Sequence, residues 1–262
     1  MNLKRIARNP FVRILAVIAA LNVFFLALQW IGNPYDTADD PQQAASSWMP
    51  PPPVVVTSTS SPPPGWPVID FPPKLPAPDA RGMQEVPTRY GLSYFVPSTS
   101  DWRPSNSAIA GWSDHAGTIT TLGAVSDYRY GYCEDGDEFP LALIGARGRN
   151  GVDLETAARE QVELAERLYT DDSGKRPRVQ FHPRELVPLA HATAVSYTAT
   201  VSNISSDRKC QPTEVRLTTV AVPAAATAEV AIFMLTSGTD DHDSLDSHEV
   251  REIIESITKY NR

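Results

Sequence analysis

An uncharged, apolar run of eighteen residues, from Ile14 to Ile31, constrains this chain more than any other feature of its sequence. As an α-helix the run would be roughly 27 Å long, close to the roughly 30 Å thickness of the hydrocarbon core of a bilayer. Only Asn22 and Gln29 are polar within it, and Trp30 lies near its end, where an indole favours the membrane interface. We therefore predict a transmembrane helix over residues 14–32, in contact with the lipid bilayer.

A cleaved signal peptide is the alternative interpretation of this run. Such a peptide typically has an apolar region of about 7 to 15 residues, followed by a small-x-small cleavage site. The pairs Leu26/Leu28 and Ala27/Gln29 do not fit such a site, and the first fit, residues 44–46, lies too far downstream. An uncleaved anchor is the prediction, and cleavage in a fraction of the molecules stays open. No cysteine follows the run closely, which excludes a bacterial lipoprotein.

The charges on the two sides of the run predict its orientation. Basic residues beside a span resist translocation, whereas acidic residues contribute little. We therefore expect residues 1–13 to be a cytoplasmic tail and the rest of the chain to lie outside the cell membrane, as in a single-pass protein. The four bases before the run are Lys4, Arg5, Arg8 and Arg13, and the acids after it include Asp36, Asp39 and Asp40.

Residues 33–80 are predicted to be a disordered, proline-rich linker. Fourteen of the 24 prolines of the chain fall within them. Proline lacks the amide donor and fixes φ, so this stretch can build neither a helix nor the interior of a sheet. Its reach is about 40 Å as a flexible coil and about 150 Å as polyproline II, which would lift a domain off the membrane. Docking of its proline runs into an aromatic groove is the alternative role.

Residues 81–262 are predicted to form one domain, long enough to bury about 70% of its unfolded surface. The domain is acidic, with 18 basic side chains against 26 acidic ones. Binding of nucleic acid requires a basic patch or stripe that neutralises phosphates, and the sequence has none. We therefore expect no nucleic-acid partner.

The apolar pattern of the domain predicts an α+β fold, a twisted antiparallel sheet flanked by two amphipathic helices. Apolar spacing of three and four residues predicts one helix over residues 154–169, with Asp153 as its N-cap. Asp246 and Glu249 form the capping box of a second helix. The predicted strands are Tyr90–Val96, Thr118–Ala124, Ser126–Tyr132, Leu141–Ala146, Ala190–Val201, Glu214–Val222 and Ala228–Thr236.

Several segments resemble a known group of proteins. They are RYGLSYFVPSTSDWRP, YGYC, LALIGARG followed by DLETAAREQVELAERLY, Cys210, and VAIFMLTSGTDDHDSLDSHEVREIIESITKY. Their order and spacing over residues 82–262 are similar to actinobacterial, membrane-anchored extracytoplasmic domains of unknown function. The resemblance implies a fold like that of PsbP-like domains, without an established activity and without functional residues that could be carried over.

The two cysteines, Cys133 and Cys210, are the clearest chemical feature of the domain. In an oxidising compartment a single pair is most simply a structural disulfide. A zinc site needs four ligands at close spacing, and a redox site usually shows a C-x-x-C motif. We therefore predict a Cys133–Cys210 disulfide and no cofactor.

Three further clusters are weaker candidates. Residues 240–243 offer carboxylates and an imidazole for a divalent cation, or they simply complement the start of the helix after Asp246. Gly145, Gly148 and Gly151, with Arg147 and Arg149 between them, could cradle an anion between a strand and a helix, or form an ordinary basic loop. Residues 113–115, Ser-Asp-His, resemble a triad in composition, but adjacent residues point in different directions.

The lone histidines and the tryptophans of the domain suggest no site of their own. His182 and His191 have no metal-binding spacing, and Trp102 and Trp112 are expected in the core, although an exposed pair could line a cleft.

The anchor, the spacer and the lack of a catalytic motif favour a non-enzymatic module that binds another envelope protein. The first alternative is a carrier or sensor of a small ligand, such as a lipid or another hydrophobic molecule, which requires an apolar pocket. The second is a metal-dependent hydrolase built on residues 240–243 or 113–115.

Overall fold

A computed structural model of the chain describes residues 74–133, 139–205 and 210–260. The predicted tail and span, and the linker up to residue 73, lie outside these residues. The chain divides into two compact units, Met1–Trp66 and Pro67–Arg262, and the architecture given below is that of the second. Of the helices in the described ranges, none combines the length and the hydrophobicity that a membrane crossing requires.

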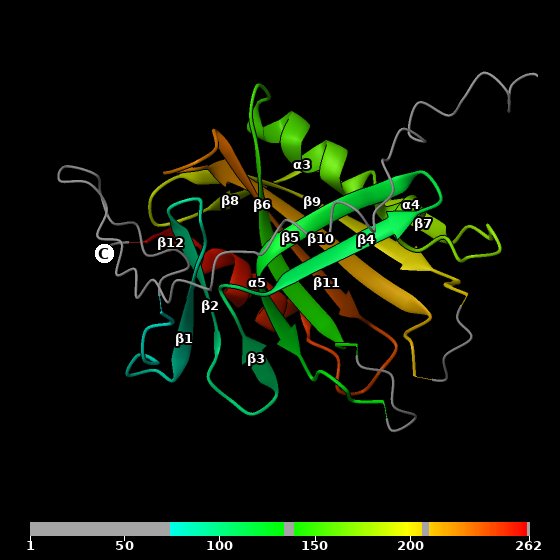
Figure 1. The fold of residues 1–262 in the computed structure, drawn as a ribbon, viewed down its shortest axis with the longest axis horizontal. Helices are drawn as coiled ribbons and strands as arrows, with labels where there is room; N and C mark the ends of the chain where they lie inside the picture. The colour runs from blue at the N-terminus through cyan, green and yellow to red at the C-terminus, as the bar shows by residue number, and fades with distance from the viewer. Residues whose placement is uncertain (1–73, 134–138, 206–209, 261–262) are drawn as a thin grey trace, which may run out of the picture. The chain divides into compact units, whose positions relative to one another are not determined.

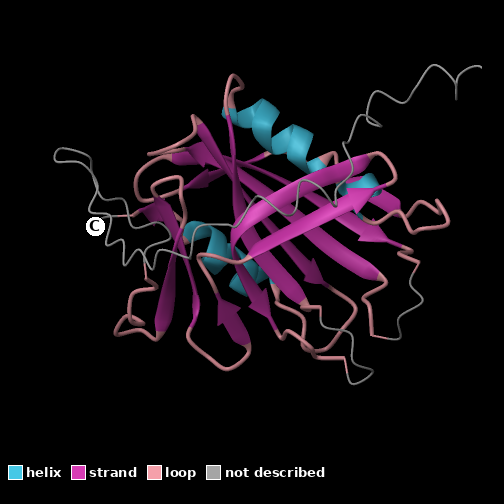
Figure 2. Cartoon of the chain, viewed as in Figure 1, coloured by secondary structure: helices cyan, strands magenta, loops and turns pink. Residues whose placement is uncertain are grey.

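The main element of the described chain is one large antiparallel sheet (Figures 1 and 2). Its strands in spatial order are β3 (Trp102–Pro104), β5 (Gly117–Tyr128), β6 (Ala142–Arg149), β11 (Val230–Gly238), β10 (Glu214–Pro223), β9 (Thr193–Ser202) and β7 (Arg178–Phe181). Two further strands pair at the edges, β4 (Ile109–Asp114) with β5 and β8 (Glu185–Pro188) with β9. The short connection from Pro223 of β10 to Val230 of β11 favours antiparallel pairing of these two strands.

A smaller sheet contains β1 (Met83–Pro87), β2 (Leu92–Pro97) and β12 (Thr258–Lys259), with β2 in the middle. It shares a hydrophobic cluster with the large sheet, in which Val86, Leu92 and Tyr94 are fully buried. Leu75, near the start of the described residues, packs against the same cluster.

The helices α3 (Leu154–Val162) and α5 (Ser247–Glu255) cover opposite faces of the large sheet (Figures 1 and 2). Successive residues of a strand point to opposite faces, and strand β10 shows the two sides. Its Val220 belongs to the cluster that contains Ile253 of α5, whereas its Ala221 belongs to the cluster that contains Ala158 of α3. The smaller sheet lies on the α5 side, so the unit has three layers.

Both predicted helix starts are confirmed. The Asp153 carboxylate accepts a hydrogen bond from the Thr156 amide, and Asp246 and Glu249 form the capping box. The first helix is bent, contrary to the single helix predicted over residues 154–169. After α3 the Leu164 amide donates to the Gln161 carbonyl, only three residues back, and a short helix α4 (Ala165–Leu168) follows. The bend lets Val162 and Ala165 both enter the core.

Two predicted strands, Thr118–Ala124 and Ser126–Tyr132, are one strand, β5. Its register with β6 shifts between Gly123 and Ser126, and Ala124 has a φ of 51°. A β-bulge of this kind bends a strand without ending it, so the interruption in the sequence pattern is a kink rather than a turn.

The structure contains the predicted Cys133–Cys210 disulfide, with the two Cα atoms 5.5 Å apart. It joins the segment after β5 to the segment before β10. The Tyr132 hydroxyl donates a hydrogen bond to the Cys210 carbonyl beside the bridge.

Candidate binding groove

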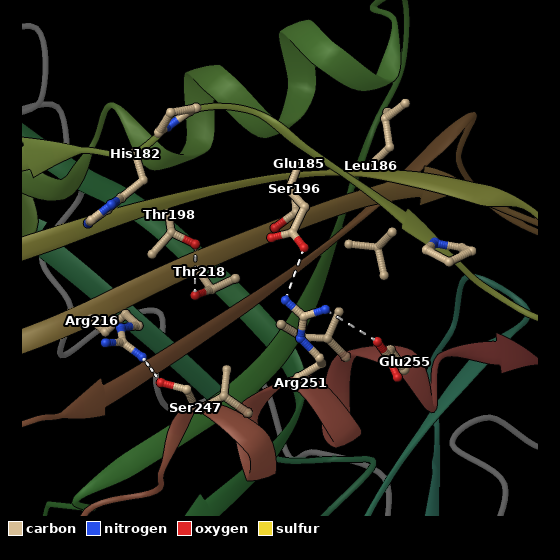
Figure 3. Close-up of a pocket in the computed structure, with 15 residues that line it drawn as sticks. His182, Glu185, Leu186, Ser196, Thr198, Arg216, Thr218, Ser247, Arg251 and Glu255 are labelled. Atoms are coloured by element: carbon tan, nitrogen blue, oxygen red, sulfur yellow. Dashed lines mark hydrogen bonds and ion pairs between the residues drawn. The ribbon is translucent and has the colours of Figure 1, made fainter.

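A groove beside α5 lies between that helix, the edge strand β8 and the strands β9 and β10 (Figure 3). We call it the β8–α5 groove, and its volume is about 410 Å³. The residues that line it are His182, Pro183, Glu185, Leu186, Val187, Pro188, Ser196, Thr198, Arg216, Thr218, Ser247, Val250, Arg251, Ile254 and Glu255.

The groove exists because one face of the sheet changes from apolar to polar along β9 and β10. Residues at every second position of a strand share a face. In β10, Val220 and Val222 pack in the cluster that α5 covers, while Thr218 lines the groove on the same face. In β9, Ala194 lies in that cluster and Ser196 lines the groove. The helix therefore buries the apolar half of the face and leaves the hydroxyl half as the floor.

Side-chain hydrogen bonds hold the polar floor and one end of the groove. The hydroxyl oxygens of Thr198 and Thr218 are 3.3 Å apart. A dashed line marks this contact in Figure 3. At the first turn of α5, Nη1 of Arg216 donates to the Ser247 hydroxyl at 2.7 Å. The described residues offer no carboxylate within 4 Å of the Arg216 guanidinium, so its charge is available to a ligand.

The two walls of the groove are joined by one exposed ion pair. Nη2 of Arg251 on α5 lies 3.1 Å from Oε1 of Glu185 on β8, and both side chains are more than half exposed. A pair this exposed contributes little to stability, so it can open without a large cost. Leu186 on β8 is 54% exposed at the lip and offers an apolar contact.

One histidine of the groove lies beside a hydroxyl. Nε2 of His182 lies 2.9 Å from the Thr200 hydroxyl, which is the distance of a base from a nucleophile. An activated nucleophile also needs a third group that orients the histidine through its other ring nitrogen. Nδ1 of His182 has no hydrogen-bond partner among the described residues. The groove thus offers hydroxyls, the Arg216 guanidinium and the His182 imidazole as recognition groups, beside the ion-paired Arg251.

The cluster predicted as a cation site is partly assembled. Ligand atoms of Asp241, His242 and Asp243 lie within 4.8 Å of one another. Asp243 is already paired with Arg129. Asp240 points elsewhere, because its Oδ2 accepts from both the amide and the hydroxyl of Thr213.

The Ser113–Asp114–His115 cluster does not form a triad. Oδ2 of Asp114 accepts from Nη2 of Arg167 at 2.6 Å, and its Oδ1 accepts from the Ala116 amide. The Arg167 hydrogen bond lowers the pKa of Asp114, against the smaller, opposite effect of desolvation. Its carboxylate is therefore engaged by an arginine rather than oriented toward a histidine.

The predicted glycine-rich loop is strand instead, because β6 continues to Arg149. Gly145 and Gly148 are packing positions: a Cβ on Gly145 would lie 2.9 Å from Cβ of Leu122, and one on Gly148 would lie 2.6 Å from the Tyr90 ring. Only Gly151, with a φ of 72°, lies in a turn. The glycines do not surround a common space, so they form no anion cradle.

The two tryptophans belong to the hydrophobic core. Trp102 is 6% exposed and its ring centroid lies 5.1 Å from that of Tyr128. Trp112 is half-buried and packs against the cluster that contains Leu122.

No sequence motif pointed to the β8–α5 groove. A signal was nevertheless present, because Ser196 and Thr198 in β9, and Arg216 and Thr218 in β10, put polar side chains at alternate positions of otherwise apolar strands. Which face they would share with α5 depends on the tertiary fold.

Comparison with known proteins gives a family and two structural neighbours. The profile of a family described as a domain of unknown function (DUF8017) matches residues 76–262. The solution structure of cyanobacterial PsbP (CyanoP) from Synechocystis is similar over 72% of this chain and 98% of that chain, with 11% identity and a TM-score of 0.41. A crystal structure from Bacteroides thetaiotaomicron covers 68% of this chain and 48% of that one, with 12% identity and a TM-score of 0.32. No curated protein matches the sequence.

Proposed function

The chain belongs to DUF8017, a family of domains of unknown function, and from the geometry of its own groove we propose that it is a non-enzymatic binding module. In this proposal residues 14–32 anchor it in the cell membrane, residues 33–73 space it from the bilayer, and the folded domain binds an envelope protein outside. The observation that carries the proposal is the β8–α5 groove, whose polar floor has an arginine without a carboxylate partner among the described residues.

The disulfide supports a location outside the cytoplasm. Reducing conditions keep most cytosolic thiols free, whereas extracytoplasmic compartments allow disulfides to persist. Both cysteines of the chain are used in the one Cys133–Cys210 bridge. The basic residues before the apolar run favour the same orientation.

The form of the groove supports a protein partner rather than a hydrophobic small molecule. A carrier of lipid-like ligands needs an enclosed and mostly apolar cavity. The floor of the groove is instead made by hydroxyl side chains, and one wall is an edge strand. An extended polar segment of a partner can bond to Thr198 on the floor and to Arg216 at the end of the groove while it contacts Leu186 at the lip.

The location is tested in intact cells that make the full chain. We expect externally added protease to degrade the domain, and a thiol reagent added after denaturation to label Cys133 and Cys210 only when a reductant is added first. Protection of the domain in intact cells, together with free thiols, would show that it lies in the cytoplasm.

The role of the groove is tested by filling it. Thr198→Phe places a ring on the floor, and Thr121→Phe on the exposed surface of β5 is the matched control. We expect full-length protein solubilised in mild detergent to migrate with its partner on native gels, and Thr198→Phe alone to lose that complex. Equal complexes in both variants, with equal unfolding temperatures, would contradict a role of the groove.

A further inference from the structure

A second pocket lies on the opposite face of the large sheet, under α3. Its volume is about 220 Å³, and it is lined by Arg147 and Arg149 of β6, by Gln161 of α3 and by five further residues. The remaining residues of its lining are Ile119, Ala157, Glu160, Leu164 and Ile232.

Arg147 is the side chain around which this pocket is built. Its Nη1 donates to the Thr120 hydroxyl at 2.8 Å and to Oε1 of Gln161 at 3.1 Å. Both acceptors are buried, with exposed fractions of 2% for Thr120 and 3% for Gln161. Gln161 also donates to Thr120 at 3.2 Å, so the three side chains form a fixed network. The guanidinium is thereby held in one position at the wall of the pocket.

The charge of Arg147 has no counterion in the part of the chain that the structure describes. Its two acceptors are neutral, and no described carboxylate lies within 4 Å of its nitrogens. The neighbouring Arg149 does have one, because its Nη2 lies 2.7 Å from Oε2 of Glu160. Among the described residues, Nε and Nη2 of Arg147 have no hydrogen-bond acceptor.

Arg147 is half-buried, and even partial burial of a guanidinium beside neutral groups has a desolvation cost, which a second cation makes larger. Burial and then the charge of Arg149 both lower the pKa of Arg147. An arginine stays protonated in a protein, so the charge persists in the pocket. The chain has 31 acidic side chains, yet the guanidinium of Arg147 is hydrogen-bonded only to neutral partners among the described residues.

We propose that this pocket binds a small oxyanion, the carboxylate or phosphate group of a soluble ligand, through the free edge of the Arg147 guanidinium. Two anion oxygens accept from Nε and Nη2 in the side-on geometry that a planar guanidinium favours. Arg149, which is paired with Glu160, also lines the pocket, and the pocket is large enough for an anion with a small organic group.

The test uses purified full-length protein at constant ionic strength, with inorganic phosphate and succinate as the two probes. The unfolding temperature is followed as each probe is titrated, because a ligand that binds only the folded state raises it saturably. We expect saturable stabilisation of the wild-type chain. Arg147→Gln should weaken binding roughly tenfold or more, since charge-assisted hydrogen bonds are lost.

Two further variants keep the test decisive. Arg178→Gln removes an exposed arginine on β7 and should leave binding unchanged. Arg147→Lys keeps the charge without the planar edge, so we expect it to fold even if Arg147→Gln does not, and to bind more weakly than wild type. No saturable response in the wild type, or a response in Arg147→Gln or Arg147→Lys equal to that of the wild type, would overturn the proposal.

Discussion

The hydroxyl of Tyr94 lies 2.7 Å from the carbonyl oxygen of Ala124, the residue at which strand β5 bends. It also lies 2.7 Å from the Ser126 hydroxyl, and Tyr94 is fully buried. Burial raises the pKa of Tyr94 far above its usual range, so the phenol remains a donor. This one side chain of the smaller sheet therefore holds the bulge of the large sheet in place.

Removing this hydroxyl should destabilise the domain. Tyr94→Phe leaves the Ala124 carbonyl without a buried donor, which costs about 1–3 kcal/mol in the free energy of unfolding. Ser126→Ala should cost less, because Tyr94 can still donate to Ala124. Urea denaturation of the three proteins measures both effects, and an unchanged midpoint for Tyr94→Phe would contradict the role of the bond.

Gly148 is a packing position, and a methyl group there should not fit. A Cβ would lie 2.6 Å from the Tyr90 ring and 2.8 Å from Cβ of Ala228, so we expect Gly148→Ala to lose about 1–3 kcal/mol of stability. Gly123 on the adjacent strand is the control, because a Cβ there meets nothing within 4 Å. Equal unfolding midpoints for the two variants would show that the Gly148 contact relaxes.

His191 should make the domain sensitive to mild acid. Both ring nitrogens are buried without a partner among the described residues, and burial and then the charge of Lys259 lower its pKa. The folded state therefore prefers the neutral ring. The pKa of a histidine in an unfolded chain is about 6.5. The stabilisation that comes from burying the neutral His191 ring is therefore complete above about pH 6.5 and is lost as the pH falls below it.

His191→Phe removes this titration, so its unfolding temperature should fall less than that of the wild type between pH 7.5 and pH 5. His115→Gln, at an exposed histidine, should follow the wild type. Parallel curves for His191→Phe and the wild type would show that His191 does not cause the acid sensitivity.

Reduction of the Cys133–Cys210 disulfide should lower the stability of the domain strongly. The disulfide closes a loop with a sequence separation of 77 residues. The chain-entropy account gives roughly 4.5 kcal/mol for such a loop, and losses of about 2–5 kcal/mol are typical. Cys133→Ala with Cys210→Ala should unfold at lower urea concentration than the oxidised wild type, by the same amount as the reduced wild type. Coincident curves for oxidised and reduced protein would contradict this expectation.

Divalent cations should not stabilise the domain through residues 241–243. Asp243 is paired with Arg129, Oδ1 of Asp241 accepts from the Asp243 amide at 2.9 Å, and the side chain of His242 is 88% exposed. We expect the same unfolding temperature with calcium, with zinc and with a chelator. A saturable rise with either metal that Asp241→Asn abolishes would instead establish a metal site.

Features that depend on neighbouring residues were predictable from the sequence. The capping box of Asp246 and Glu249 involves four consecutive positions, and the strands β9, β10 and β11 are long and apolar enough to be recognised alone. The first and last residues of these strands were predicted within about three residues, which is usual for element boundaries.

Features that depend on distant partners were not predictable. Strand β12 has two residues and forms only through β2, which is 165 positions earlier at the Thr258–Ser93 pair. Gly145 and Gly148 resemble a loop in the sequence because the residues that pack against them, Leu122 and Tyr90, come from other segments of the chain. The β8–α5 groove likewise needs Glu185 and Arg251 together, 66 positions apart.

The most direct test of a binding module outside the membrane is site-specific photo-crosslinking in intact cells. A photoreactive amino acid replaces Leu186 at the lip of the β8–α5 groove, or Ile109 at the opposite edge of the large sheet, which is 74% exposed. We expect a discrete crosslinked envelope protein from position 186, absent from position 109 and lost when Thr198→Phe fills the groove. No crosslink at position 186, or the same products from both positions, would contradict the proposed function.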